Sequence, residues 1–364
     1  MRIAAKRGRS RWRLGLAVLA LLLALGAVAV YLKQYAAEMV KKQMEFSAWL
    51  VDWQWQEGLS DLPNVDGGLD SLHLFAVYFN AQDKLLVNEA MQDMQMGIQE
   101  TFQQLEIAAP PRLYMTVVND IWQEDGTSLQ KDTRLVTRLV ESEASRQSHI
   151  EELLELADAY GLDGIELDYE RIGEQDWDRV VLLITELYDQ LAERGKSLRV
   201  VLEPEAPLEA LTLPQGPEYV VLAYNLYGTH SGPGPKADPS FVKKQARRLK
   251  QISGDHVLAL AAGGFDWQQG GEGKVRSVTE QRAKELVEEH QAAPVRDEES
   301  GSLHFNYRDD QGIEHIVWYA DQITLSQWMR AAQQQGIHQI ALWRLGELGE
   351  GTLHYFNDLH DESL

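Results

Sequence analysis

The sequence contains no cysteine among its 364 residues. This absence excludes disulfide bonds and metal sites built on thiolates. No histidine pair has the spacing of metal ligands with an acid nearby, and no Gly-rich phosphate-binding fingerprint follows an apolar run. His73, His256 and His338 are instead assigned to strand packing or loops. We therefore expect no metal and no cofactor.

Positive charge is scarce beyond the first 42 residues. That segment holds nine Lys or Arg and a single acid, Glu38, so its net charge is 9 − 1 = +8. The net charge of the whole chain is −22, so the rest of the chain carries −22 − 8 = −30. A body this acidic repels nucleic acid backbones, and no basic patch with interleaved aromatic residues offsets it. We expect no nucleic acid partner.

One long apolar run occupies residues 14–32, enough to cross a bilayer as a helix at about 1.5 Å per residue. The basic flank over 1–13 predicts that this end stays in the cytoplasm and that the part after a linker at 33–45 is exported. The segment is predicted to be a retained, single-pass membrane anchor. The alternatives are a signal peptide cleaved after Ala27-Val-Ala29 and a buried helix of a soluble protein.

Eight short apolar runs, most of them followed by a helical pattern, predict a fold of class α/β, a (β/α)₈ TIM barrel over residues 46–358. Helical periodicity is clear at 150–160, 180–193, 240–251, 279–290 and 324–335 and poor between the first two runs. A doubly wound open sheet is the alternative. The predicted strands are Ala48–Trp53, Leu72–Phe79, Leu113–Val118, Gly164–Glu170, Leu198–Leu202, Tyr219–Asn225, His256–Ala262 and Gln339–Arg344.

Residues 291–322 do not suit a plain connection between a strand and a helix. Two apolar runs, 303–307 and 315–319, flank the turn residues 308–312. This pattern predicts a β-hairpin. We expect a small antiparallel insertion between the seventh strand and the last helix, raising one wall of a cleft.

The segment Gly161–Glu170 carries an unusual strip of acids. In a strand, Glu166, Asp168 and Glu170 would lie on one face, because side chains alternate with a period of two. Acids this close repel one another and compete for protons, which favours a proton-transfer site. The alternative is a solvated edge strand, but the flanking helical patterns predict a strand buried on both faces.

The chemistry of such barrels lies at the carboxyl ends of the strands. Aromatic rings, acids and an amide collect there, and this combination suits a sugar, whose C–H faces stack on rings while its hydroxyls need polar partners. Trp343, taken alone, fits the core better than a sugar platform. Trp49, Trp53 and Trp55 fit either a substrate wall or packing at the bottom of the barrel. The strand-end residues are Asp168, Glu170, Glu203, Glu205, Tyr224, Asn225, Phe265, Asp266, Trp267 and Trp343.

These residues resemble the family 18 glycoside hydrolases, the chitinase-like group. The fourth strand of that family carries Asp-Gly-x-Asp-x-Asp-x-Glu, which corresponds to Asp163-Gly-Ile-Glu-Leu-Asp-Tyr-Glu170 with Asp163 and Gly164 as its structural start. Tyr224-Asn225 matches a Tyr-Asp pair, and Trp343 matches a Trp on the last strand. The segments 224–235, 257–267 and 316–321 are similar to the bacterial spore-germination and cortex-lytic branch. The resemblance covers about residues 46–350.

The resemblance implies substrate-assisted, retaining hydrolysis of a β-linked N-acetylglucosamine polysaccharide, either peptidoglycan or a chitin-like chain. Glu170 would protonate the leaving oxygen, and the substrate's own acetamido carbonyl would attack the anomeric carbon. Asp168 and Tyr224 would hold the acetamido group, and Trp343 would form the floor beneath the sugar. Glu166, Asn225, Asp266 and Trp267 complete the expected substrate-binding set.

Two positions depart from the family pattern, and two other functions compete. Glu166 and Asn225 stand where Asp is commoner, which puts the rate and the pH optimum in doubt and motivates a catalytically weak or inactive glycan-binding module as the main alternative. A barrel that binds a divalent metal through Asp168, Glu170 and Glu203 is the other. We expect the protein to be a monomer.

Overall fold

The computed structural model describes residues 44–107, 109–123, 125–270 and 273–360. The predicted anchor at 14–32, its basic flank and all but the last two residues of the predicted linker lie outside the described residues. Among the helices that are described, none is long and apolar enough to span a bilayer.

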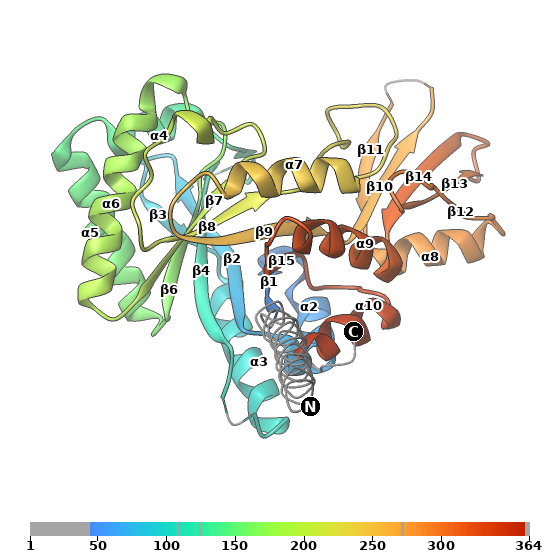
Figure 1. Cartoon of the computed structure of the whole chain (residues 1–364), viewed down its shortest axis with the longest axis horizontal. Coiled ribbons are helices and arrows are strands. Elements are labelled where there is room, and N and C mark those ends of the chain that lie inside the picture. The colour runs from blue at the N-terminus through green and yellow to red at the C-terminus, as the bar shows by residue number, and fades with distance from the viewer. Residues whose placement is uncertain (1–43, 108, 124, 271–272, 361–364) are drawn as a thin grey trace, which may run out of the picture. The chain divides into compact units, whose positions relative to one another are not determined.

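Eight parallel strands form a closed barrel (Figure 1). Each strand pairs with its neighbours in chain order, and β2 pairs with both β1 and β4 while β15 pairs with β1, which closes the ring. The predicted TIM barrel is confirmed, and the open-sheet alternative is wrong. The strands are β1 (Glu45–Val51), β2 (Ser71–Asn80), β4 (Arg112–Trp122), β6 (Gly164–Asp168), β7 (Ser197–Leu202), β8 (Glu218–Leu222), β9 (Asp255–Ala261) and β15 (Gln339–Trp343).

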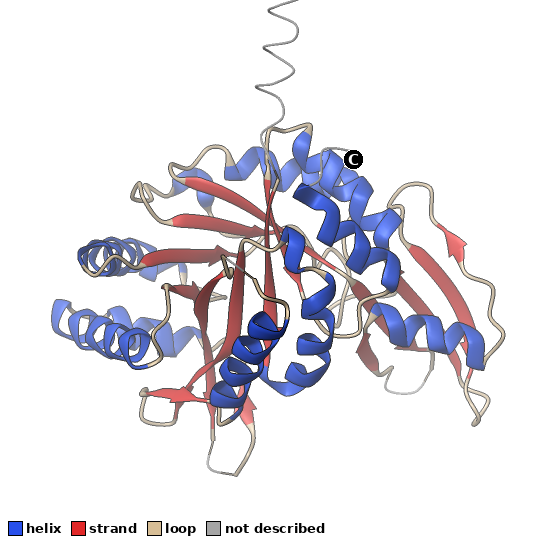
Figure 2. Cartoon of the chain, turned by 90° about the horizontal axis from the view of Figure 1, so that it is seen from below, coloured by secondary structure: helices blue, strands red, loops and turns tan. Residues whose placement is uncertain are grey.

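Helices surround the barrel strands (Figure 2). The connection from β7 to β8, described throughout, carries only a single 3-10 turn at Leu208–Ala210. Two short strands, β3 (Leu85–Val87) and β5 (Ser128–Leu129), extend β2 and β4 in antiparallel fashion. The helices that cover the barrel are α2 (Trp55–Asp61), α3 (Ala90–Gln104), α4 (Thr133–Val140), α5 (Glu143–Ala159), α6 (Trp177–Glu193), α7 (Pro239–Leu249), α9 (Gln322–Gln333) and α10 (Glu350–Asn357).

Local sequence sets the entry into β6. Helix α5 begins at a capping box, in which the side chains of Ser142 and Ser145 each accept a hydrogen bond from the other's backbone N–H. It ends before Gly161, whose φ of +61° lies in the left-handed region that glycine adopts without strain. The chain then turns directly into β6, as the order of helix, glycine and strand predicts.

A five-stranded antiparallel sheet is inserted between β9 and α9 (Figure 1). It contains the predicted hairpin as β13 and β14, but it extends beyond the segment 291–322, because the chain enters this sheet at β10, immediately after β9. Helix α8 (Glu280–Glu289) packs against it. The strands of the insertion are β10 (Gly263–Gln268), β11 (Val275–Val278), β12 (Val295–Arg296), β13 (Leu303–Arg308) and β14 (Glu314–Ala320).

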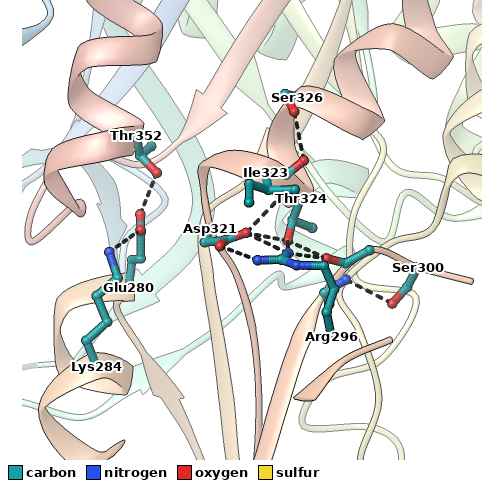
Figure 3. Close-up of polar contacts among 11 residues, drawn as sticks. Glu280, Lys284, Arg296, Ser300, Asp321, Ile323, Thr324, Ser326 and Thr352 are labelled. Atoms are coloured by element: carbon teal, nitrogen blue, oxygen red, sulfur yellow. Dashed lines mark hydrogen bonds and ion pairs between the residues drawn. The ribbon is translucent and has the colours of Figure 1, made fainter. Parts of the chain in front are cut away.

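Two polar contacts fasten the insertion (Figure 3). Arg296 on β12 forms an ion pair with Asp321, the residue that caps α9, at 2.7 Å. Glu280 at the start of α8 accepts a hydrogen bond from the Thr352 hydroxyl on α10 at 2.7 Å. Both carboxylates are therefore engaged by the protein itself.

The two faces of β6 have different surroundings. Ile165, Leu167 and Tyr169 join the large apolar core between the strands and the helices. The alternate residues face the barrel interior, where a smaller cluster of Val, Leu and Ala is closed by the rings of Trp49 and Tyr224. The predicted alternation along this strand is confirmed, and it directs Glu166 and Asp168 away from the apolar core.

Candidate active site

The start of β6 is fixed by Asp163 and Gly164. The Asp163 carboxylate accepts a hydrogen bond from the backbone N–H of Leu113 at 2.8 Å, which ties the base of β6 to β4. A Cβ at Gly164 would lie 2.4 Å from the Ser197 carbonyl oxygen and 2.5 Å from the Tyr114 ring. Only glycine fits between these neighbours, so this pair sets the position of the acids that follow.

A cavity of about 280 Å³ opens at the carboxyl ends of the barrel strands. Five of the predicted catalytic and substrate-binding residues contribute to its wall: Asp168, Glu170, Tyr224, Asn225 and Trp343. Aromatic side chains form much of the remainder, and Asp120 and Lys131 add one charge of each sign. The other lining residues are Trp53, Phe75, Tyr78, Trp122, Ser128, Gln130 and Leu222.

Glu170 lies two residues beyond the end of β6 and is held from both sides. The Asn119 side chain accepts a hydrogen bond from the Glu170 N–H at 3.0 Å and donates one to the Glu170 carbonyl at 2.9 Å. The Glu170 carboxylate pairs with the ammonium group of Lys131. The backbone clamp fixes where the carboxylate projects, and the contact with Lys131 holds it there.

Asp168 is buried in the same cavity, and its Oδ1 atom has no hydrogen-bond partner within the described residues. Burial, and then the nearby charge of Glu170, raise the pKa of Asp168 well above its ordinary value. The raised pKa favours the protonated form of the Asp168 carboxyl group. A buried carboxyl oxygen without a partner can bind a polar hydrogen of a ligand.

Tyr224 and Trp343 add a donor and an apolar platform. Burial, and then the charge of Asp168, raise the pKa of Tyr224 well above its ordinary value. The hydroxyl group therefore stays protonated and can donate a hydrogen bond. The Trp343 ring lies edge-on to Phe75, with 5.3 Å between centroids, and next to Trp53 at 6.4 Å. Acids, a phenol and a group of aromatic rings thus meet around one cavity of about 280 Å³.

Residues 130–347 match the family model described as Glycosyl hydrolases family 18. The match covers more than half of the chain. The chain belongs to this family.

The chain is also similar to curated relatives in sequence and to solved structures in fold. An uncharacterized glycosylase of Bacillus subtilis, YvbX, is 24% identical over 236 residues, which cover 60% of this chain and 67% of YvbX. The chain spans about half the length of the other curated relatives. Among solved structures, the spore cortex-lytic enzyme SleL of Bacillus cereus aligns with a TM-score of 0.70 at 17% identity, covering 86% of this chain and 73% of SleL. A chitinase of Chromobacterium violaceum aligns with a TM-score of 0.73 at 17% identity over 88% of this chain and 99% of its own.

Glu166 does not line the cavity of this family 18 barrel. It is fully buried deeper in the interior, where its carboxylate accepts hydrogen bonds from the Trp49 indole at 2.6 Å and the Thr116 hydroxyl at 2.7 Å. Its second oxygen contacts His73 Nδ1 at 3.1 Å and Arg199 Nε at 2.8 Å. Glu166 therefore cannot touch a substrate in the cavity. It is the centre of a buried polar network, of which Trp49 and His73 are structural members.

The network keeps Glu166 ionised and His73 neutral. Burial alone would raise the pKa of Glu166, but the contacts with His73 and Arg199 outweigh it and lower the pKa to about 2. Burial, and then the charge of Arg199, lower the pKa of His73. Arg199 also contacts His73 Nε2 at 2.9 Å. Since Arg199 can only donate, Nε2 accepts, and the imidazole proton sits on Nδ1 and points to Glu166.

Asp266 and Trp267 also lie outside the cavity wall. They belong to β10, which carries them into the inserted sheet. The Asp266 carboxylate accepts a hydrogen bond from the Tyr307 hydroxyl at 2.8 Å and contacts His315 Nδ1 at 2.8 Å, while the Trp267 indole donates to the Ser231 carbonyl at 3.3 Å. The side chains of both residues are thus occupied within the protein.

Asn119, Asp120 and Lys131 are among the residues of the family 18 site that were not predicted. Asn119 and Asp120 follow the third predicted strand, so the strand-end rule that locates Asp168 locates them too. Lys131 comes from the turn after β5, has a φ of +54°, and donates its backbone N–H to Asp120 at 2.8 Å. No sequence pattern indicates that this turn folds back over the acids.

Glu203 lies near Glu170 but is bound to the backbone. Its carboxylate accepts a hydrogen bond from the Arg171 N–H at 2.6 Å, and burial raises its pKa to about 7. Among the residues that the structure describes, no group of three or more His, Asp or Glu side chains is arranged to hold a metal ion.

Proposed function

We propose that this protein hydrolyses β-linked N-acetylglucosamine glycans with retention of configuration, using the substrate's acetamido group as the nucleophile. One observation carries the proposal: a buried Asp168 oxygen without a partner lies beside the positioned acid Glu170, in a cavity walled by aromatic rings. Membership of family 18 and the structural similarity to a spore cortex-lytic enzyme and a chitinase support it.

Each side chain then has one role. Glu170 protonates the leaving glycosidic oxygen and later takes a proton from water. Asp168 accepts the acetamido N–H, which turns the acetamido oxygen toward the anomeric carbon, and Tyr224 donates to the same group. Trp343 stacks beneath the sugar, and the amide of Asn225, exposed at the mouth, bonds to hydroxyl groups.

Digestion of defined glycans tests the proposal. Purified protein should release fragments with new reducing ends from peptidoglycan, from N-acetylglucosamine oligomers, or from both, and mass spectrometry would identify the bond that is cut. Saturable binding without cleavage over long incubation would instead show a glycan-binding module.

Replacement of Lys131 by Met should shift the alkaline limb of the pH–rate profile to higher pH. The ammonium of Lys131 lowers the pKa of Asp168, opposing burial and the charge of Glu170. Without it, the Asp168 carboxyl group keeps its proton to higher pH and can still pass that proton to Glu170, the residue that protonates the leaving oxygen. Initial rates between pH 4 and 10 measure the shift, and Lys131→Arg should leave the limb in place. An unmoved limb in Lys131→Met would show that Lys131 does not control this proton.

We also propose that residues 14–32 anchor the protein in the cell membrane, with the barrel on the extracytoplasmic side. The support is the apolar run and the basic flank that precedes it. Such a position would place the site next to cell-wall glycans. Membrane fractionation of the full-length chain, together with protease treatment of intact cells, distinguishes an anchored protein from one released after signal cleavage.

A further inference from the structure

A second cavity of about 430 Å³ adjoins the acid-containing one. Trp53 and Trp343 line both cavities, so the two spaces meet at these rings. The wall of the second cavity comes from the loop after β8, from β11 and the start of α8 in the insertion, and from the segment after β15. A glycan lying across Trp343 would therefore place its next units in this space.

Lys236 is a basic residue in this wall that has no anionic partner within the described residues. Its ammonium donates to the Ala262 carbonyl at 2.9 Å and lies 5.2 Å from the centre of the Phe265 ring. Within the described residues, no carboxylate lies within ion-pair distance of it. Burial, and then the charge of Arg344, lower the pKa of Lys236 to about 7. A nearby anion would reverse this effect and favour the charged amine.

Arg344 is the second such cation. Its guanidinium donates to the Leu345 carbonyl at 3.0 Å and to the side-chain oxygen of Gln54, and it lies 5.8 Å from the centre of the Trp53 ring. Both hydrogen-bond acceptors are neutral. Its charge therefore adds to that of Lys236 in the same cavity.

The other charged groups of the wall are engaged elsewhere. Glu280 binds Lys284 at 2.7 Å, the Gly349 N–H at 3.0 Å and the Thr352 hydroxyl at 2.7 Å (Figure 3). Arg282 is paired with two acids of its own helix. Glu347 accepts a hydrogen bond from the Thr279 hydroxyl at 2.8 Å and attracts Arg344 only from beyond ion-pair distance. Lys236 and Arg344 are thus left to face a ligand.

We propose that the second cavity is a subsite for a carboxylate carried by the glycan, and that the preferred substrate is an acidic N-acetylated glycan of the peptidoglycan type rather than a neutral homopolymer. This inference rests on the proposed hydrolase function. The body of the protein carries a charge of about −30 and repels an acidic polymer at long range, so cations at the point of contact are needed to hold one. Carboxylates are bound best by charge-assisted hydrogen bonds from Lys and Arg.

The test compares KM and kcat on two soluble substrates of equal length: peptidoglycan glycan strands whose peptides have been removed, which leave lactyl carboxylates, and neutral N-acetylglucosamine oligomers. Lys236→Met and Arg344→Gln should each raise KM for the acidic strands about tenfold and leave KM for the neutral oligomers unchanged. Lys250→Met, an exposed lysine at the end of α7, serves as the control and should change neither.

Further arms identify the source of the carboxylate. Methyl esterification of the lactyl groups should remove the preference of the wild type for the acidic strands. Strands with intact peptides show whether a peptide carboxylate substitutes for the lactyl one.

Lys236→Arg keeps the positive charge and should retain the preference for the acidic strands, which would show that the position tolerates substitution. Equal losses on both substrates, or no loss on the acidic one, would overturn the subsite while leaving the hydrolase function intact. Absence of cleavage of either substrate by the wild type would instead refute the hydrolase function.

Discussion

Glu170→Gln should lower kcat by a factor of about 10² to 10⁴ and leave substrate binding nearly unchanged. Glutamine keeps the shape of the side chain but cannot donate a proton to the leaving oxygen. The Asn119 clamp binds only the backbone of residue 170, so the variant should keep its local structure. Rates of reducing-end release and oligosaccharide affinity, measured on the same preparations, separate the two effects.

Glu174→Gln is the matched control, because Glu174 is an exposed carboxylate four residues further along the chain. It should retain the wild-type rate. Unchanged turnover in Glu170→Gln would remove Glu170 from the mechanism. Equal affinity with no turnover in either wild type or variant would show a binding module.

Arg199→Met should destabilise the barrel by about 3–5 kcal/mol. Arg199 is almost completely buried and pairs with Glu166 at 2.8 Å and with Glu218 at 3.1 Å. Removing it leaves the charge of Glu166 in the barrel interior with only neutral donors. A lower midpoint of thermal unfolding, followed by tryptophan fluorescence, measures the loss.

Two further variants test the cause of this loss. Arg247→Met removes an exposed arginine near the end of α7 and should leave the unfolding midpoint unchanged. The double variant Glu166→Gln with Arg199→Met should be more stable than Arg199→Met alone, since the buried charge is then gone. A double variant whose loss equals or exceeds the sum of the two single losses would contradict the assigned pairing.

The barrel was predictable because each of its strands is a short apolar run and most of these runs are followed by a helical pattern. The start of β6 at Gly164 after the glycine stop at Gly161 is one example. The inserted sheet was harder to predict. Its first strand, Gly263–Gln268, follows β9 after a single residue, so the apolar pattern does not mark where the barrel ends and the insertion begins.

The strand-end rule located the acids and Trp343 because neighbouring parallel strands all end at one rim of the barrel. It failed where the chain continued as a strand, since Asp266 and Trp267 are carried into the insertion by β10. Glu166 shares a face with Asp168 but lies two residues, or about 7 Å, deeper. Its partners His73 and Arg199 come from other strands, and one strand's pattern cannot reveal them. Lys131 depends on a turn of unusual backbone conformation.

The stereochemistry of the first product tests the central claim most directly. Proton NMR of an N-acetylglucosamine-containing oligomer during the first minutes of hydrolysis should show a new reducing end in the β configuration, before mutarotation, and the same oligomer without its acetyl groups should not be cleaved. A new reducing end formed as the α-anomer, or equal cleavage of the deacetylated oligomer, would contradict substrate-assisted catalysis at Asp168 and Glu170.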